Sequence, residues 1–296
     1  MKTKKNKFLK VDKKKANSFV SKFTFTKNLS LIIPFILISA ILVIAPIIVI
    51  LINVFNPTTG NVSDNWGIMT GTIWEKIGKS LWISIVSTLI SFLIAFPFAY
   101  SLSLIKNKAF QSMVVLFVTT PIWINILIKL IGLKSLFDIM NNEINSTYGD
   151  LYTLIGLVYL FTPFMIMPLY SSLQTLPKNL INASKDLGRG NFYTFIHIVI
   201  PWCKVAIASG ITLVLLPSFT TVSVSAFLNN SNDGGLIGDV IVNQGDSGLS
   251  NPISLARTSV LVLVVSGITL FVYVSIIYIP KLFFIIKRKI GARNEK

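Results

Sequence analysis

The residue types that usually carry catalysis are scarce and scattered in this sequence. It has one histidine, His197, one cysteine, Cys203, and 11 acidic residues spread over 296 positions. These cannot assemble a Ser-His-Asp triad, a histidine metal cluster or an internal disulfide. A G-x-x-x-x-G-K-[ST] stretch is absent too, so we expect no ATP hydrolysis by this chain. We therefore predict that the chain has no catalytic residue, no metal ligand and no cofactor-binding residue. We expect that it is not an enzyme.

The most patterned polar segment is 174–201, which lies between two long apolar runs. Pro177 suits the first turn of a short helix. Gly188 is expected to break that helix, because glycine reaches left-handed backbone conformations at little cost. Asn191 is a suitable N-cap for a second helix, which we expect to end at Pro201. The pattern predicts a helix, a glycine elbow and a second helix.

The spacing in this segment resembles the EAA loop of ABC-importer permeases, which reads E-A-A, three residues, G, nine residues and I-x-L-P. Here Asn182-Ala183-Ser184, Gly188 and Ile198-Val199-Ile200-Pro201 occupy those positions. Asn182 replaces the acidic residue, Ser184 the second alanine and Ile200 the leucine, and all three roughly keep the size of the family's residues. Asn182 lacks the charge that an ion pair at that position would need. The alternative without a specific function is an ordinary amphipathic loop at the membrane interface.

The resemblance implies a coupling loop that docks in a groove on a cytoplasmic ATPase. The coupling residues that it implies are Asn182, Ala183, Ser184, Asp186, Leu187, Gly188, Phe192, Ile198 and Pro201.

The composition is that of a membrane protein, with 53% hydrophobic and only 13% charged residues. About 20 apolar residues cross the hydrocarbon of a bilayer, and such a segment must be helical to satisfy its backbone. We predict an all-α integral membrane protein with six transmembrane helices and a cytoplasmic two-helix coupling loop, 174–201, between spans four and five. The predicted spans are about 30–54, 80–104, 112–133, 152–173, 203–227 and 258–286.

Charge gives the expected orientation. With the N-terminus inside, the inner segments carry 22 of the 27 basic residues and three of the 11 acidic ones. The positive-inside rule then places both termini and the coupling loop in the cytoplasm of a multi-pass plasma (inner) membrane protein. Basic cytoplasmic tails, 1–28 and 287–296, flank the transmembrane domain at 29–286. We assign the basic N-terminal tail to topology and to anionic lipid rather than to nucleic acid.

Two further segments resemble the spermidine/putrescine permease subfamily, in its B-type subunit. They are Phe96–Tyr100 in span two and Pro121–Lys129 in span three. Pro97 and Pro121 are expected to kink their helices, either for packing alone or beside a water-filled path.

Polar residues within the spans are candidates for lining a substrate path. Trp123 is one, although a packing or interfacial role is the simpler interpretation, and Asn125 is another. Lys129 is expected to extend toward the membrane interface. Span five is rich in hydroxyls, which favours the bundle interior. Its candidate path residues are Ser218, Thr220, Thr221 and Ser223.

The predicted outer loops are acidic, through Asp138, Glu143, Asp150, Asp233, Asp239 and Asp246. They form either an electrostatic funnel for a cation or ordinary solvated surface. Gly234–Ile241 also resembles the B-type permeases. We expect a re-entrant turn, a short helix or a docking site for an external binding protein there.

The resemblance implies a permease subunit of an ATP-driven ABC importer, with polyamines as the expected cargo. Its expected partners are a second permease, two ATPase subunits that hold ATP and Mg, an extracellular substrate-binding protein and membrane lipid. One alternative is an importer of another small solute. A secondary transporter is a weaker alternative, because we find no convincing repeat and almost no intramembrane charge.

Overall fold

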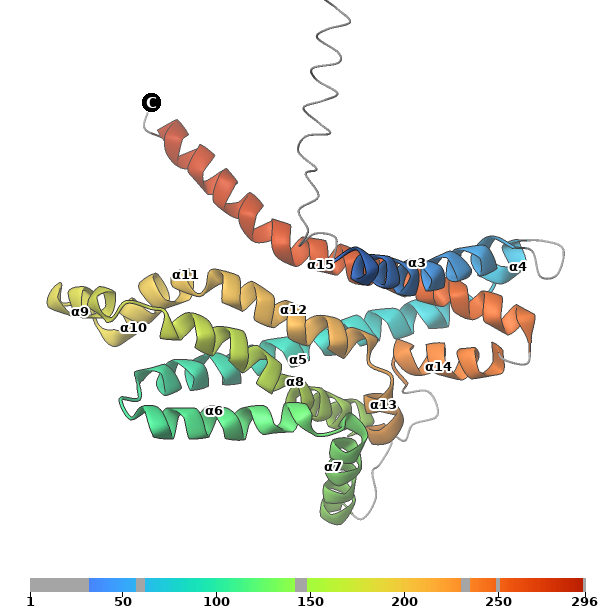
Figure 1. Cartoon of the computed structure of the whole chain (residues 1–296), viewed down its shortest axis with the longest axis horizontal. Coiled ribbons are helices and arrows are strands. Elements are labelled where there is room, and N and C mark those ends of the chain that lie inside the picture. The colour runs from blue at the N-terminus through green and yellow to red at the C-terminus, as the bar shows by residue number, and fades with distance from the viewer. Residues whose placement is uncertain (1–31, 57–61, 142–147, 230–234, 249–250, 295–296) are drawn as a thin grey trace, which may run out of the picture. The chain divides into compact units, whose positions relative to one another are not determined.

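The computed structural model describes residues 32–56, 62–141, 148–229, 235–248 and 251–294. The basic tail at 1–28 and three residues of the predicted outer loops, Glu143, Asp233 and Gly234, lie outside the described residues. The described elements are all helices (Figure 1): α3 (Ile33–Phe55), α4 (Ser63–Trp66), α5 (Gly71–Leu104), α6 (Lys108–Trp123), α7 (Ile126–Asn141), α8 (Gly149–Gln174), α9 (Lys178–Asp186), α10 (Asn191–Thr194), a π-helical turn (Phe195–Val199), α11 (Ile200–Trp202), α12 (Lys204–Thr220), α13 (Ser223–Leu228), α14 (Ile237–Gly248) and α15 (Pro252–Asn294).

The chain divides into two units, Met1–Ile52 and Asn53–Lys296. The first contributes most of α3, an apolar helix with Pro46 inside it. The second holds every other described helix. All contacts described below lie within the second unit.

Within the described ranges, four helices are long and apolar enough to cross a membrane: α3, α5, α8 and the Pro252–Tyr278 part of α15. Two bent helix pairs raise the number to as many as six. Lys108–Trp123 and Ile126–Met140 meet at 97°, and Asn191–Trp202 and Lys204–Thr220 meet at 72°. Predicted span three is therefore not a straight single helix. The 72° bend lies at the start of predicted span five, and that span is interrupted at Thr221 and Val222, between α12 and α13. The second span also starts earlier than predicted, at Gly71, because charged residues near its start depress the hydropathy there.

The break in span three falls after Trp123, near the predicted kink at Pro121. Ile124 is extended, and the Asn125 side-chain oxygen accepts a hydrogen bond of 2.8 Å from Leu127 N at the start of α7. The Lys129 amine donates to the Pro121 carbonyl at 2.9 Å. Lys129 therefore folds back on the break, where we had expected it to extend toward the interface.

The core of the second unit forms where α5, α8 and α12 pack together. Along α5, small hydroxyl residues recur at helical spacing and are completely buried, including Ser80, Ser84, Ser87 and Ser91. Small side chains let helices approach closely in a membrane. Ser84 and Thr88 satisfy their hydroxyls on carbonyls one turn back, so the stripe buries no unpaired group at these two positions.

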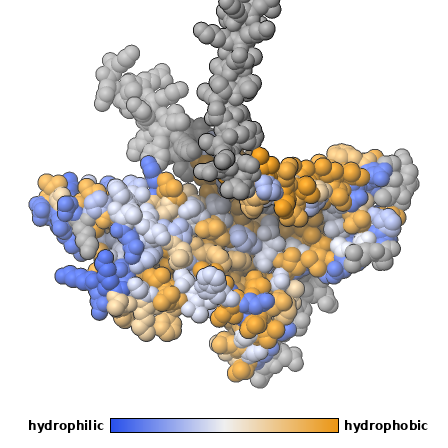
Figure 2. All heavy atoms as spheres, viewed as in Figure 1, coloured by the Kyte–Doolittle hydropathy of each residue, from blue (hydrophilic) through white to orange (hydrophobic). Residues whose placement is uncertain are grey.

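The packed helices α5, α8 and α12 run between two ends of this bundle (Figure 1). At one end lie α9 and α10, where Figure 2 shows hydrophilic side chains gathered on the surface. At the other end α13 and α14 lie near the start of α5. The side-chain contacts of the coupling loop lie at the first end, and those of α13 and α14 lie at the second.

Candidate functional site

The elbow of the 174–201 loop has the predicted geometry. α9 follows Pro177, and Gly188 has a φ of +73°. The helix end is closed by Gly188 N donating to Lys185 O at 2.8 Å and by Arg189 N donating to Ser184 O at 3.1 Å. These bonds satisfy carbonyls that a helix end leaves free. Glycine at 188 is explained by its backbone alone, because a Cβ there would meet no atom within 4 Å.

The second helix differs from the prediction at both ends. Its N-cap is Gly190, and Asn191 is the first helical residue. The helical run continues through the π-helical turn and past Pro201 to Trp202, and it breaks at Cys203, which is buried. Proline is tolerated near the start of α11, because the first turn of a helix needs no partner for its N–H groups.

A buried hydroxyl pair joins the two arms of the loop. Ser184 of α9 and Thr194 of α10 hydrogen-bond through their side-chain oxygens at 2.7 Å, and both are nearly inaccessible. Thr194 also donates to Gly190 O at 3.2 Å. Ser184, a predicted coupling residue, therefore faces the inside of the loop and holds its arms together.

Aromatic contacts attach the loop to α5. The Phe195 ring makes edge contacts with Phe96, at 5.1 Å between centroids, and with Tyr100, at 5.3 Å. Phe96 and Tyr100 lie one turn apart on the same helix face. Such pairs contribute about 0.5–1.5 kcal/mol beyond their area burial. These rings connect the loop to α5.

The outer face of the loop carries most of the predicted coupling residues. Leu187 and Phe192 expose 79% and 78% of their surface. Both are large apolar side chains on an otherwise polar end of the bundle (Figure 2). Ile198 is half-buried, and the other exposed members of the predicted set are Asn182, Ala183, Asp186, Gly188 and Pro201.

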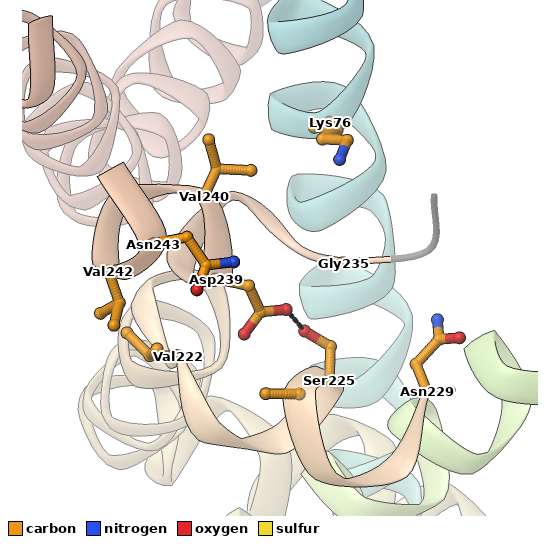
Figure 3. Close-up of a pocket in the computed structure, with 10 residues that line it drawn as sticks. Lys76, Val222, Ser225, Asn229, Gly235, Asp239, Val240, Val242 and Asn243 are labelled. Atoms are coloured by element: carbon orange, nitrogen blue, oxygen red, sulfur yellow. Dashed lines mark hydrogen bonds between the residues drawn. The ribbon is translucent and has the colours of Figure 1, made fainter. Parts of the chain in front are cut away.

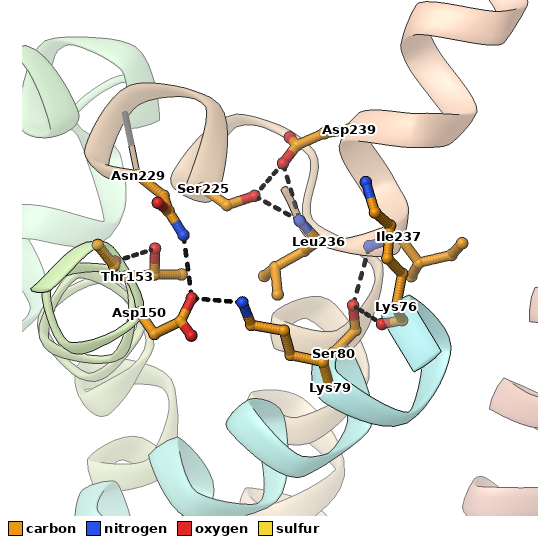
Figure 4. A network of polar contacts seen from close by, with 11 residues as sticks. Lys76, Lys79, Ser80, Asp150, Thr153, Ser225, Asn229, Leu236, Ile237 and Asp239 are labelled. Atoms are coloured by element: carbon orange, nitrogen blue, oxygen red, sulfur yellow. Dashed lines mark hydrogen bonds and ion pairs between the residues drawn. The ribbon is translucent and has the colours of Figure 1, made fainter. Parts of the chain in front are cut away.

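A second polar arrangement lies at the opposite end of the bundle (Figure 4). The Asp239 carboxylate of α14 accepts hydrogen bonds from Ser225 Oγ and, at 3.0 Å, from Leu236 N. Ile237 N donates to Ser80 Oγ of α5 at 2.8 Å. The start of α14 is therefore held by both α13 and α5.

A second set of contacts adjoins the first. Lys79 of α5 pairs with Asp150 of α8 at 2.8 Å, and Asn229 after α13 donates to the same carboxylate oxygen at 3.0 Å. Both Asp150 and Asp239, expected as acids of the outer loops, thus make contacts between helices. Their carboxylates therefore connect helices in addition to placing negative charge at this end of the bundle.

A pocket of about 250 Å³ opens between these elements (Figure 3). Asp239 lines it and is only 8% exposed. Its Oδ2 takes the bonds described above, while its Oδ1 is buried and has no hydrogen-bond partner among the described residues. Leaving a buried acceptor unpaired costs about 1–3 kcal/mol, and more for a charged group.

Burial is the main influence on this carboxyl. It raises the pKa of Asp239 above the ordinary value of 3.8. Hydrogen bonds from Ser225 and the Leu236 amide, and the positive charge of Lys76, oppose that rise with smaller effects.

The predicted path residues are dispersed and lie outside this pocket. Trp123 is 87% exposed, and Asn125 caps α7. Ser218 is fully buried inside α12, and its hydroxyl has no hydrogen-bond partner among the residues that the structure describes. Thr220 donates to the Leu216 carbonyl. Thr221 and Ser223 flank the break between α12 and α13.

Sequence reasoning did not group the residues that do line the pocket. Lys76, Asn229 and Asn243 come from segments far apart in the chain and were not singled out. One signal was available, since Gly234–Ile241 is less polar than a free loop. We expected a re-entrant turn, a short helix or a docking site in that segment. The structure contains a short helix, α14, which begins at Ile237.

Comparison with known proteins identifies the family. Residues 67–282 match the profile of the binding-protein-dependent transport system inner membrane component. The chain belongs to this family. It is therefore a multi-pass inner-membrane transport protein, and the matched residues include both the loop and the pocket.

Its relatives are similar over most of their length. The Mycoplasma genitalium spermidine/putrescine transport system permease protein PotB homolog is 38% identical over 273 residues, which are 89% of this chain and 96% of the relative. The Mycoplasma pneumoniae homolog is 45% identical, covering 66% and 71%. The Escherichia coli PotB protein is 32% identical, covering 68% and 76%.

A solved structure shares the fold. A chain of a bacterial ABC transporter involved in alginate import superposes with a TM-score of 0.65 at 16% identity. The match covers 82% of this chain and 92% of the other. This similarity establishes the ABC-importer permease fold.

Proposed function

We propose that this chain is a membrane-spanning permease subunit of an ATP-driven ABC importer for the polyamines spermidine and putrescine. Its PotB-named relatives support the cargo, at 32–45% identity. The coupling geometry of the 174–201 loop supports the ATP-driven mechanism. The complete assembly contains a second permease, two ATPase subunits that hold ATP and Mg, and an extracellular substrate-binding protein.

The observation that carries the proposal is the outer face of the loop. Leu187 and Phe192 project from a closed elbow, and the Ser184–Thr194 bond makes the two arms one body. An ATPase groove that receives these side chains would move the loop as a unit. Phe195 then passes that movement to Phe96 and Tyr100 of α5.

The bundle responds by alternating access. Closure of the two ATPase subunits on ATP draws the coupling loops together, and the helix bundles rock between inward and outward openings. In this mechanism the described residues dock the loop on the ATPase and pass its movement to α5. Phosphate chemistry belongs to the partner chains.

Co-purification tests the docking face. The tagged chain is expressed with its partner subunits and purified in mild detergent, beside a Leu187→Glu variant. Leu187 is exposed, so a charge there should spare the fold while reducing recovery of the ATPase by about tenfold or more, as expected for a docking residue worth at least 1.4 kcal/mol. The matched control is Asn179→Glu, which adds the same charge to α9 outside the predicted coupling set.

Uptake tests the cargo. Proteoliposomes containing the complete complex should accumulate labelled spermidine only with ATP inside and binding protein outside. ATP-dependent uptake of a different solute, with none for spermidine or putrescine, would contradict the polyamine assignment and retain the importer. Recovery of the wild-type chain alone, stable and monodisperse, would contradict the importer itself.

A further inference from the structure

The Asp239 carboxylate holds the start of α14 with only one of its two oxygens. Asp239 Oδ2 accepts from Ser225 and Leu236, whereas Oδ1 is buried in the pocket wall and has no partner in the part of the chain that the structure describes. A buried polar atom in this state normally has an unseen partner. Because this atom belongs to a carboxylate, the fitting partner donates hydrogen bonds and carries positive charge.

The walls indicate what kind of cation fits. Val222, Val240 and Val242 line the pocket together with the amide side chains of Asn229 and Asn243 (Figure 3). An apolar wall with a few polar groups suits an organic ligand that has both a hydrocarbon part and a polar end. A volume of about 250 Å³ also exceeds what a single water needs, which is about 30 Å³.

A divalent metal ion fits this lining poorly. Ca²⁺ takes six to eight oxygen ligands and Mg²⁺ requires a near-ideal octahedron. The pocket supplies one carboxylate, and the described residues contain no group of three or more metal-binding side chains.

Lys76 is the pocket's own ammonium group. Its positive charge acts on the Asp239 carboxyl, yet no ion pair joins the two side chains in the described part of the chain. The lysine stem is flexible, so the amine can withdraw when another cation enters. Figure 4 shows Lys76 beside the start of α14, one helical turn from Ser80.

We propose that the Asp239 pocket binds the ammonium end of a linear alkylamine, with Oδ1 accepting its hydrogen bonds and the valines contacting its methylenes. The inference rests on the proposed function for the identity of that amine, a polyamine. It adds a cargo contact that lies at the end of the bundle opposite the coupling loop.

Thiol labelling of the whole purified complex tests this inference. In a Cys203→Ser background, Asn243→Cys places a thiol in the pocket wall. Ser247→Cys, one turn further along α14 and outside the pocket lining, is the matched control. The probes are 2-aminoethyl methanethiosulfonate, which carries an ammonium, and the anionic 2-sulfonatoethyl reagent.

The expected result has three parts. The cationic reagent should be preferred at position 243 by about tenfold more than at position 247, as a carboxylate in a low-dielectric pocket would produce. Spermidine should slow that labelling, whereas sodium chloride of equal ionic strength should not. Asp239→Asn should abolish both effects. Equal preference at the two thiols, or no protection by spermidine, would overturn the proposal.

A second variant covers the case in which Asp239→Asn fails to assemble. Lys76→Met removes the competing ammonium and keeps most of the stem, so it should increase the cationic preference at position 243. An unchanged or reduced preference would overturn the proposal. Spermidine uptake by the wild-type complex distinguishes failure of this inference from failure of the proposed function. If the complex takes up spermidine but spermidine does not slow labelling at position 243, only the pocket proposal is refuted.

Discussion

At the scale of single residues, buried hydroxyl groups do much of the positioning. Ser184 and Thr194 join the arms of the loop, while Ser80 and Ser225 hold the start of α14. The sequence motif could indicate that a small residue belongs at 184. It could not indicate that this residue faces Thr194, because that contact depends on how the elbow folds the two arms together.

The hydroxyl pair makes a prediction about stability. Thr194→Val should lower the free energy of unfolding by about 1–3 kcal/mol, because it leaves the Ser184 hydroxyl buried without its partner. The Ser184→Ala, Thr194→Val double variant should lose less than the sum of the two single changes. Thermal unfolding of the purified complex, in a double-mutant cycle, measures this. Additive losses would show that the contact contributes nothing.

Asp239 makes a prediction about pH. Its pKa is raised in the folded chain, so the folded state binds the proton more tightly than the unfolded state. The stability from this group is therefore full below the ordinary pKa of 3.8 and is lost as the pH rises through the higher folded value.

The Asp239→Asn variant tests the sign of that effect. It removes the titrating group and keeps the shape, so its stability should fall less than that of the wild type as the pH rises from about 4 toward neutrality. Unfolding midpoints of both complexes over a pH series provide the measurement. A wild type that gains stability over the variant as the pH rises would contradict a raised pKa.

At the scale of elements, hydropathy predicted where apolar segments lie and failed where helices break. The runs at 30–54 and 152–173 correspond closely to α3 and α8. The breaks in spans three and five depend on local caps such as Asn125 and on packing. Gly238 illustrates the packing, because a Cβ there would lie 2.4 Å from the Thr221 carbonyl in the second break. A hydropathy window averages over such features.

The elbow glycines make a prediction about backbone conformation. Gly188→Ala should cost about 1–2 kcal/mol of stability, because an L-residue at a φ of +73° is strained. Gly190→Ala is the matched control, since Gly190 has a φ of −65° and its added Cβ would meet no atom within 4 Å. Chemical denaturation of the complex compares them. Equal effects at the two positions would mean that the left-handed backbone at 188 is not what requires glycine.

At the scale of the whole molecule, the loop and the pocket occupy opposite ends of the same helices. Ser80 contacts Ile237, and Phe96 contacts Phe195, so α5 alone separates the two contacts by about 24 Å at 1.5 Å per residue. The loop was predictable because its pattern is local. The pocket was not, because its residues come from three helices and from the two connections that flank α13.

The positive-inside argument makes a prediction about sidedness. In a Cys203→Ser background, an impermeant maleimide should label Ser247→Cys in intact cells, and Leu187→Cys only after the membrane is opened. Both positions are exposed, so a difference in labelling reports the side of the membrane. Labelling of Leu187→Cys in intact cells would reverse the expected orientation.

The double attachment of α5 also constrains how this gene can change in length. One residue inserted between Ser84 and Phe92 would rotate one end of the helix by about 100° and shift it by about 1.5 Å relative to the other. The contacts of Ser80 with α14 and those of Phe96 and Tyr100 with Phe195 could then no longer form together. Point substitutions can accumulate along this helix, but insertions and deletions should be eliminated by selection within it and tolerated in the connections between helices.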